Sequence, residues 1–441
     1  MEAFPSRADE RATLSHRPTW DEFYSLQRFG IHPDLDNIQR FCRRLGHPVR
    51  AFPSVHVAGT NGKGSTVALL DSILRRAGLT VGRYTSPHIL RFEERILVGG
   101  EMIPEAAVFD FLQEHWDFIR EHGLTFFETA TAMALDYFRH RQVDVAVVEV
   151  GLGGTWDATR VVQSLVSVVT RIDYDHTDRL GSTLEEIAGD KAGIFRPDRP
   201  AVSFRQRPEV LAVLKSKAQQ TGASFFLAED LVALSSLELS PERTTGAASL
   251  THTHPPIHLR SWECPLVGSY QVENIMLALA AGELLREHFP TIDERAIKAG
   301  LSGVSWPGRL QVLRRRPWVV VDVGHNPGAV RETLRNAREL WRPRRLLAVF
   351  SALKDKDVAG MLAGLRDGAD LTILAPLPPP RGLTLADLEA QARQVDWTPR
   401  SAGSVAEALR LALDLADSED LILALGSHLV AEEAQKMQII S

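Results

Sequence analysis

The sequence predicts a two-domain α/β protein with mainly parallel sheets. Short apolar segments alternate with helical segments through most of the 441 residues, a pattern typical of parallel α/β sheets. A glycine-rich loop follows an early apolar segment, where such domains bind phosphate groups. The alternation stops and then restarts around residues 300–316, which predicts a domain boundary. The predicted parts are a flexible tail at 1–20, a nucleotide-binding domain at 21–304, a linker at 305–316 and a C-terminal α/β domain at 317–441.

Composition excludes several classes of protein. The chain is 44% hydrophobic and 24% charged, which is ordinary for a soluble globular protein and excludes a disordered or fibrous one. Its formal net charge is −6, which argues against a nucleic-acid coat. The two cysteines, Cys42 and Cys264, make neither a disulfide framework nor a C-x-x-C motif. With no apolar run of about 18 residues and no apolar segment in the first twenty residues, we expect a cytoplasmic protein without membrane helices.

Apolar patterning predicts the elements in order along the chain. In the first domain, two segments are almost continuously apolar, as in strands buried on both faces of a parallel sheet. The stretch 231–261 is rich in Ser, Thr, His and Pro and predicts irregular strands and loops. The expected strands are 53–58, 143–150, 165–172, 318–323, 345–350, 371–376 and 421–425. The expected helices are 65–77, 126–140, 270–287, 329–340, 357–366, 385–395 and 405–416, with the proline run 378–380 in a surface loop.

The strongest local signal is the segment AGTNGKGST at residues 58–66, between a predicted strand and a predicted helix. Its glycines let backbone N–H groups approach a phosphate, Lys63 can neutralise β/γ-phosphate charge, and Ser65 can bind Mg²⁺. The alternative is a glycine-rich turn that Ser65 caps. Position 57 is Val, so the spacing is a shorter loop that resembles those of ATP-dependent amide ligases of the Mur type. The predicted ATP-binding residues of this loop are Asn61, Gly62, Lys63, Gly64, Ser65 and Thr66.

Three more polar side chains are candidates for the site. Glu149 ends one strand and is either a Mg²⁺ ligand or a member of a buried ion pair. His176 follows the next strand; histidine is an unusual Mg²⁺ ligand, but both residues come from strands that we expect to be adjacent. Lys191 ends a helix that Ser182 or Thr183 caps, and the residues alone favour a surface lysine interacting with the helix dipole.

These segments, in this order and spacing, resemble the folylpolyglutamate synthase/dihydrofolate synthase family of the Mur ligase superfamily. The resemblance extends from about Phe29 onwards and implies a Mur-ligase-like fold, with an N-terminal P-loop ATPase domain and a C-terminal Rossmann-like domain. The other matching segments are TSPH at 85–88, ERI at 94–96, TFFE at 125–128, TA at 131–132, Gln271 with Asn274, PGR at 307–309, DVGHNP at 322–327 and GS at 426–427.

The resemblance also implies roles for individual residues. Lys63, His176 and Lys191 would be catalytic, and Lys191 would carry a carbamate formed with CO₂. The implied metal ligands are Ser65, Ser86, Glu149, His176 and Lys191. The implied ATP contacts outside the loop are Asn274, Arg309, Asp322 and His325. The implied substrate contacts are Pro87, Arg95, Thr125, Phe126, Phe127, Glu128, Trp156, Asp157 and Ala158.

The implied activity is ATP-dependent ligation of L-glutamate to a folate or dihydropteroate carboxylate through an acyl phosphate, which gives ADP and phosphate. Cofactors would be ATP and Mg²⁺, with a monovalent cation as a further candidate. We expect a monomer with small-molecule substrates and neither nucleic-acid nor membrane partners. Two alternatives stay open: a Mur-type ligase acting on another carboxylate such as a UDP-linked peptide, and a nucleotide-binding regulatory ATPase. The sequence does not separate dihydrofolate synthase from polyglutamate-extending activity.

Some positions depart from the family pattern. Arg160 stands where Asn usually follows Asp-Ala-Thr, Tyr270 stands where His often precedes Gln, and Val323-Gly324 replaces Gly-Ala. None of these changes removes a predicted metal or phosphate group. The histidines His252, His254 and His258 form an H-x-H pattern that can bind metal, but we expect solvated histidines there.

Overall fold

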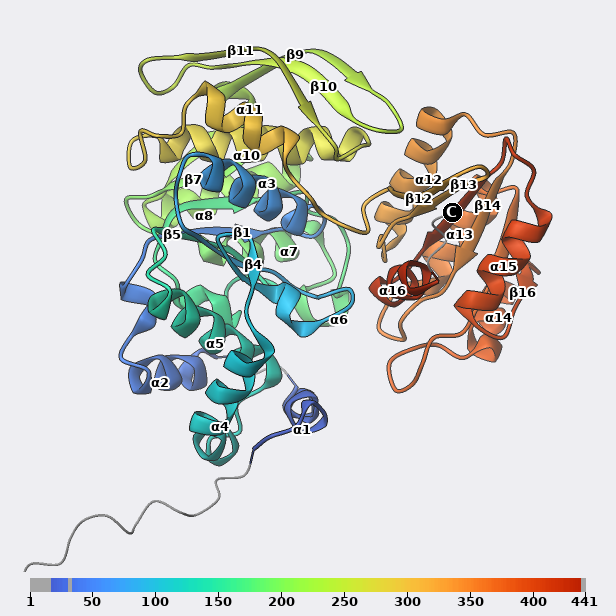
Figure 1. Cartoon of the computed structure of the whole chain (residues 1–441), viewed down its shortest axis with the longest axis horizontal. Helices are drawn as coiled ribbons and strands as arrows, with labels where there is room; N and C mark the ends of the chain where they lie inside the picture. The colour runs from blue at the N-terminus through green and yellow to red at the C-terminus, as the bar shows by residue number, and fades with distance from the viewer. Residues whose placement is uncertain (1–16, 31–33, 438–441) are drawn as a thin grey trace, which may run out of the picture.

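The computed structural model describes residues 17–30 and 34–437. Most of the predicted tail, residues 1–16, lies outside the described part. Trp20, which we assigned to the tail, instead begins helix α1 (Trp20–Ser25), and its ring packs 5.0 Å from that of Phe109 between centroids. The prediction of two α/β domains with mainly parallel sheets is confirmed (Figure 1).

The N-terminal domain is built on an eight-stranded sheet with the order β4-β3-β2-β5-β1-β6-β7-β8. Strands β2, β5, β1, β6, β7 and β8 run parallel, and β3 and β4 form an antiparallel edge. The strands are β1 (Ser54–Ala58), β2 (Val81–Tyr84), β3 (Ile96–Val98), β4 (Glu101–Met102), β5 (Val145–Glu149), β6 (Ser164–Val169), β7 (Pro200–Ser203) and β8 (Ser224–Leu227).

Helices cover both faces of this sheet (Figure 1). Val147 of β5 packs with α3, α10 and α11, whereas Val148 packs on the opposite face with α2, α4 and α5. The period-two alternation of a strand thus supplies two separate cores. The helices are α2 (Asp36–Arg44), α3 (Lys63–Arg76), α4 (Glu105–Glu121), α5 (Phe126–His140), α6 (Thr177–Leu180), α7 (Leu184–Lys191), α8 (Pro208–Thr221), α9 (Ala228–Leu231), α10 (Ser269–Leu285) and α11 (Glu294–Ser302).

The segment 231–261, for which the sequence predicts irregular strands and loops, forms an antiparallel sheet of β9 (Val232–Leu239), β10 (Thr244–Leu250) and β11 (Ile257–Cys264), which lies over α10 and α11 (Figure 1). The register shifts in both strand pairs near the middle of β10, so the strands are irregular as predicted, but they form one continuous sheet. Alternate residues of β10 are buried, but small and hydroxylated side chains hide this alternation in the sequence. His252 packs against the Phe226 ring, and His258 Nδ1 lies 3.1 Å from Ser249 Oγ.

The C-terminal domain is a doubly wound sheet with the order β12-β13-β17-β14-β15-β16. Only the edge strand β12 runs antiparallel to its neighbour. Residues 311–315, which we assigned to the linker, form this strand. The strands are β12 (Gln311–Arg315), β13 (Trp318–Val321), β14 (Leu346–Phe350), β15 (Leu371–Leu374), β16 (Arg400–Ser401) and β17 (Leu421–Leu425).

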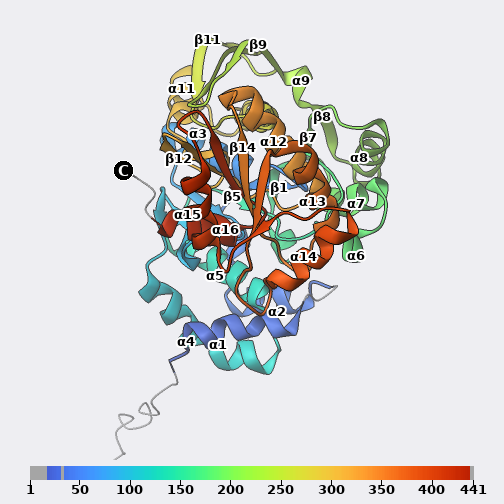
Figure 2. The same cartoon turned by 90° about the vertical axis from the view of Figure 1, so that its right-hand side faces the viewer.

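Five helices flank this second sheet. Helices α12, α13 and α14 contribute to the core on one face, and α15 and α16 to the core on the other. The view in Figure 2 places this domain in front of the N-terminal domain. No helix in the described residues is both long and apolar enough to cross a membrane. The helices are α12 (Pro327–Trp341), α13 (Val358–Gly368), α14 (Leu385–Gln394), α15 (Val405–Leu415) and α16 (His428–Lys436).

A close helix contact gives a test of the packing between α3 and α11. A Cβ on Gly300 of α11 would lie 2.5 Å from the Ile73 Cα atom of α3. We therefore expect Gly300→Ala to lower the free energy of unfolding by about 1–3 kcal/mol through overpacking. Gly282 of α10 has no atom within 4 Å of such a Cβ, so Gly282→Ala should raise stability by about 0.5–1 kcal/mol through helix propensity. Thermal melting compares the two variants, and equal melting temperatures would contradict the contact.

Candidate active site

A cavity of about 450 Å³ lies between the two domains and is lined by residues from both. On the N-terminal side it is lined by segments that follow β1, β2, β5 and β6 at the carboxyl edge of the sheet. On the C-terminal side it is lined by the segment that follows β13 and by α12. The predicted residues that line the cavity are Asn61, Gly62, Lys63, Gly64, Ser65, Ser86, Pro87, Glu149, His176, Lys191, Asn274, Arg309, Asp322 and His325.

The glycine loop connects β1 directly to the N-terminus of α3, as predicted. Gly62 has φ 96°, and a Cβ there would lie 2.2 Å from Asn274 Oδ1. A Cβ on Gly64 would lie 2.4 Å from Cζ2 of Trp306. Both positions therefore exclude a side chain, because α10 and the interdomain segment pack directly on the loop. The N–H groups of the first turn of α3 have no acceptor within the helix, so they can donate hydrogen bonds to phosphate oxygens.

Two lysines converge on one backbone oxygen of this loop. Lys63 Nζ donates to the Gly59 carbonyl at 3.0 Å, and Lys191 Nζ donates to the same oxygen at 2.9 Å. Burial, followed by the charge of Lys63, lowers the pKa of Lys191 to about 7. The expectation from the residues alone, a surface lysine, is wrong, because Lys191 is only 4% exposed. Packing of α7 against the loop decides this burial, and no local pattern records it.

Glu149 lies beside the loop because β5 and β1 are neighbours in the sheet, with Val57 in register with Glu149. Its Oε2 atom accepts a hydrogen bond from the Ser86 N–H at 3.1 Å. Burial raises the pKa of Glu149, and the nearby Lys63 opposes that rise. No described residue forms an ion pair with Glu149, so the structure does not support the ion-pair alternative.

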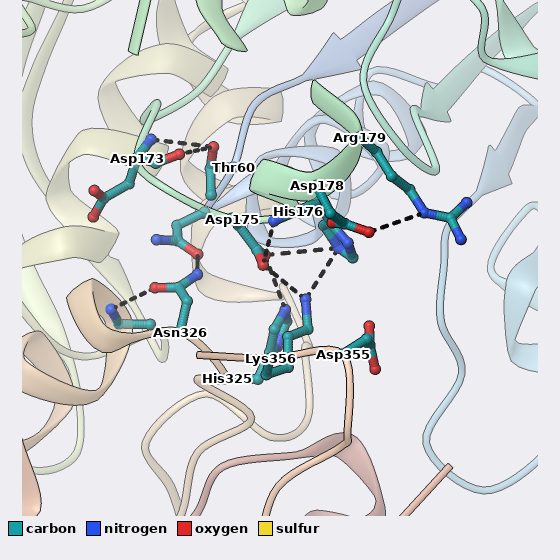
Figure 3. A network of polar contacts seen from close by, with 12 residues as sticks. Thr60, Asp173, Asp175, His176, Asp178, Arg179, His325, Asn326, Asp355 and Lys356 are labelled. Carbon is teal, nitrogen blue, oxygen red and sulfur yellow. Dashed lines mark hydrogen bonds and ion pairs between the residues drawn. The ribbon is translucent and has the colours of Figure 1, made fainter. Parts of the chain in front are cut away.

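A polar network joins the domains at His176 (Figure 3). Lys356, from the segment between β14 and α13, donates to Asp175 Oδ1 at 2.8 Å, and its Nζ lies 3.0 Å from His176 Nε2. His325 Nε2 lies 3.6 Å from Asp175 Oδ2. Burial alone would raise the pKa of Asp175, but His325 and Lys356 hold it well below its ordinary value. Burial lowers the pKa of His176 to about 4, so its imidazole is neutral at neutral pH.

Further hydrogen bonds cross between the domains beside the cavity. Asn326 Nδ2 donates to Asn61 Oδ1 at 2.9 Å (Figure 3), and Tyr270 Oη donates to Asp322 Oδ2 at 3.0 Å. The carboxylate of Asp322 also accepts hydrogen bonds from Leu310 N–H, Gly324 N–H and Thr333 Oγ1. The departure at Tyr270 therefore falls on a contact that connects α10 to a predicted ATP-binding residue.

Sequence reasoning missed Lys356 and Asp175 as parts of the site. Asp175 directly precedes His176, so the same sequence segment could have identified it. Lys356 lies 180 residues from His176 in the chain, and no spacing pattern relates the two. Its side chain is only 6% exposed, which is unusual for a lysine in a polar segment.

The predicted substrate residues other than Pro87 do not line the cavity. The Thr125 and Glu128 side chains form the capping box of α5, and Asp157 accepts hydrogen bonds from the N–H groups of Leu152 and Thr159. Their capping contacts account for these polar groups, and substrate binding by them stays a prediction. The remaining members are Arg95 and Phe126, which stack together, Phe127, which packs on Gly151, the exposed Trp156, and Ala158, which begins a short 3₁₀ helix. Thr66, predicted as an ATP contact, is buried within α3.

Comparison with known proteins follows the same two-domain division. The Mur ligase middle domain matches residues 57–282, and the Mur ligase glutamate ligase domain matches residues 308–428. The chain is 38% identical over 399 residues to a dihydrofolate synthase/folylpolyglutamate synthase of Escherichia coli, covering 90% of this chain and 89% of that protein. It is 37% identical over 369 residues to the Bacillus subtilis protein of the same name, covering 82% and 85%.

Solved structures agree with these relatives. Mycobacterium tuberculosis folylpolyglutamate synthase complexed with ADP superposes with a TM-score of 0.86 at 32% identity, covering 94% of this chain and 96% of that one. Escherichia coli FolC in complex with DHPP and ADP superposes with a TM-score of 0.83 at 36% identity, covering 94% and 96%. The matches to both Mur ligase domains, together with the solved structures, place this two-domain chain among the ATP-dependent ligases of the Mur type. Within that class, the chain belongs to the folylpolyglutamate synthase/dihydrofolate synthase family, whose members are ATP-dependent glutamate ligases.

The bridge through Lys356 gives a test of domain closure. Lys356→Met leaves the buried Asp175 carboxylate without its ammonium partner, a loss of about 3–5 kcal/mol when a buried pair is broken. We expect the closed arrangement to become less populated and kcat to fall at least tenfold, about 1.4 kcal/mol. Lys354→Met is the matched control, because Lys354 is exposed and donates only to the Pro380 carbonyl. Equal kcat values for the two variants, or an unchanged radius of gyration in solution scattering with ATP, would contradict this role.

Proposed function

We propose that the interdomain cavity joins L-glutamate to a folate or dihydropteroate carboxylate, with ATP as the phosphoryl donor. The observation that supports this most directly is the meeting of the glycine loop, Glu149 and Lys191 in one cavity that both domains line. The names of the relatives supply the substrate class, since they are dihydrofolate and folylpolyglutamate synthases. ADP and DHPP in the Escherichia coli complex fit the same proposal.

The glycine loop and its Lys63 would bind the phosphates of ATP. Phosphoryl transfer to the substrate carboxylate replaces an oxide, which is a poor leaving group, with phosphate. The resulting acyl phosphate is attacked by the amine of L-glutamate; the amide forms, phosphate leaves and the amine loses a proton. Lys63 would neutralise charge on the transferred group, since its ammonium contacts only carbonyl oxygens of its own loop.

The donor set fits Mg²⁺ in part. Glu149 supplies one buried carboxylate, and Ser65 and Ser86 add hydroxyl groups beside the loop. The described residues contain no group of three acidic, histidine or cysteine side chains arranged to hold a metal, but Mg²⁺ usually binds through one or two carboxylates, water and substrate phosphates. When bound, Mg²⁺ would neutralise phosphate charge. His176 fits less well, because its Nε2 atom already faces the ammonium of Lys356.

Lys191 is suited to react with CO₂. Carbamylation requires a neutral amine, and the pKa of Lys191 is lowered to about 7 by burial and by Lys63. The carbamate would replace a positive charge next to Lys63 with a negative one, which relieves the repulsion between the two side chains. Its oxygens would add the hard ligands that Mg²⁺ prefers.

The other assignments belong to the same proposal. Asn274, Arg309, Asp322 and His325 would contact ATP, and Pro87 would contact the second substrate. The protein would work as a cytoplasmic monomer whose C-terminal domain closes over ATP. A monovalent cation is a further candidate cofactor.

The deciding experiment offers the protein ATP, Mg²⁺ and labelled L-glutamate with either dihydropteroate or tetrahydrofolate. We expect ADP release that depends on both glutamate and a pterin substrate, with a product heavier by one or more glutamate residues in mass spectrometry. Lys63→Ala should abolish ligation and leave the melting temperature nearly unchanged, since its ammonium bonds only to loop carbonyls. ADP release that ignores both substrates would favour the regulatory ATPase instead.

The metal assignment predicts a change in Mg²⁺ requirement. Glu149→Gln and His176→Ala should each raise the Mg²⁺ concentration for half-maximal activity by about tenfold or more, with a smaller effect on pterin binding. Glu273→Gln serves as the control, because Glu273 also lines the cavity but is paired with Arg171. An unchanged Mg²⁺ titration in both variants would make Glu149 and His176 structural groups.

Carbamylation of Lys191 is tested with ¹³CO₂ and carbon-13 NMR. We expect a carbamate signal that rises with pH through about 7, since the protonated amine has no lone pair to attack CO₂. Lys191→Ala should abolish the signal and the activity, and acetate should partly restore the activity. Lys63→Ala should shift the onset to higher pH, because it removes the neighbouring cation. Full activity without a carbamate signal would refute the modification.

A further inference from the structure

A second cavity, of about 520 Å³, lies at the amino ends of the strands of the N-terminal sheet, on the side opposite the active site. Its walls are the end of α2 and the segment after it, the 3₁₀ helix at Ala158–Val161, residues 195–197 and the end of α8. The first three of these wall segments precede or connect to the amino ends of β1, β6 and β7, and α8 leads into β8. The active-site loop leaves from the carboxyl end of β1, so the length of a strand, about 15–20 Å, separates the two cavities.

The lining of this cavity is strongly basic. Arg43, Arg50, Arg160 and Arg196 line it together with His47, and no carboxylate is among its lining residues. None of the four arginines forms an ion pair with a described residue, although the chain as a whole has more acidic than basic residues, 56 against 50. The absence of acidic residues among the charged lining residues is therefore a local feature and does not follow from composition.

Some of the N–H groups of these arginines donate hydrogen bonds to the protein, and the others have no acceptor among the described residues. Arg196 donates to the carbonyl oxygens of Ile194, Phe195 and Arg160, and its guanidinium is thereby satisfied. Arg160 donates only through Nε, to Gly193 O at 2.8 Å. Within the described residues, neither Nη group of Arg160 and no guanidinium nitrogen of Arg43 or Arg50 has an acceptor.

The positive charges of these arginines lower the pKa values of neighbouring basic side chains. Burial and the nearby Arg160 lower the pKa of Arg196 to about 10. Burial, with further contributions from Arg196 and Arg160, also lowers the pKa of the buried His56 well below its ordinary value. Arg160 and Arg196 are half-buried rather than solvated, so water screens their charges less than those of surface arginines. An anion in the cavity would remove this repulsion.

We propose that this cavity binds a small oxyanion that carries two or more negative charges. Guanidinium groups match phosphate and carboxylate oxygens through paired N–H donors, and three of them have unused donors. The volume suits a small ligand. The position of Arg160, where the family pattern has Asn, makes the site a property of this chain. The proposal does not depend on the ligase activity.

Calorimetric titration with two probes tests the site and the source of the anion. Inorganic tripolyphosphate represents phosphate ligands, and tri-γ-glutamate represents carboxylate ligands, both in buffer without phosphate or Mg²⁺. The variant is Arg43→Gln combined with Arg160→Asn. The matched control is Arg400→Gln, which removes an exposed arginine of β16 in the other domain. We expect at least one probe to bind the second cavity of the wild type, and the double variant to weaken that event by about tenfold or more.

The active-site loop supplies an internal control for the phosphate probe. Tripolyphosphate binding at that loop should persist in the double variant and weaken in Lys63→Ala, which shows that the double variant is folded. If tripolyphosphate does not bind at the active-site loop while binding in the second cavity depends on Arg43 and Arg160, the assignment of the loop to nucleotide binding fails and this inference stands. Equal binding of both probes to the wild type and the double variant would overturn the inference. So would the absence of any event beyond the active-site loop.

Discussion

The carboxyl edge of the eight-stranded sheet is the constraint on which the site depends. Strand β1 lies between the parallel strands β5 and β6, and all three end at the same edge, so the segments that follow them meet without any long loop. We expected the strands before Glu149 and His176 to be adjacent, but they are not, and instead share β1 as a neighbour. Pairing of these strands brings the glycine loop, Glu149 and the Asp175-His176 segment together. Parallel sheets generally bind ligands at this edge, and the cavity here follows that rule.

Around the glycine loop, buried charged side chains are compensated by backbone groups rather than by ion pairs. Lys63 and Lys191 share the Gly59 carbonyl, and Glu149 is held by a backbone N–H. Such groups are costly when buried without partners, and a ligand that brings negative phosphates and a cation satisfies them together. The proposed carbamate acts in the same direction, because it reverses the sign of one of two repelling groups.

The second domain completes the site through a few long-range contacts. Lys356 reaches Asp175 and His176, Tyr270 reaches Asp322, and Asn326 reaches Asn61. Each contact connects the two domains. Each also lies within or directly beside a segment that we predict to bind a ligand. The cavity is therefore assembled from side chains of both domains. The basic cavity at the amino ends of the strands differs in this respect, since its walls all belong to the N-terminal domain.

The sequence by itself determined the features that depend on local physics. Helix 126–140 was predicted with the observed bounds, the glycine loop was placed between strand and helix, and the seven predicted strands were found within a few residues. Strands β2, β7 and β8 of the first sheet were not predicted. The tertiary structure alone decided the burial of Lys191, the bridge made by Lys356 and the pairing of the strands at 232–264 into one sheet. Local backbone preference and apolar periodicity act over a few residues, so they are visible in the sequence. The contact between a lysine and a residue 180 positions away depends on packing that exists only in the folded chain. The same holds for a strand whose small side chains do not differ in hydrophobicity between its two faces.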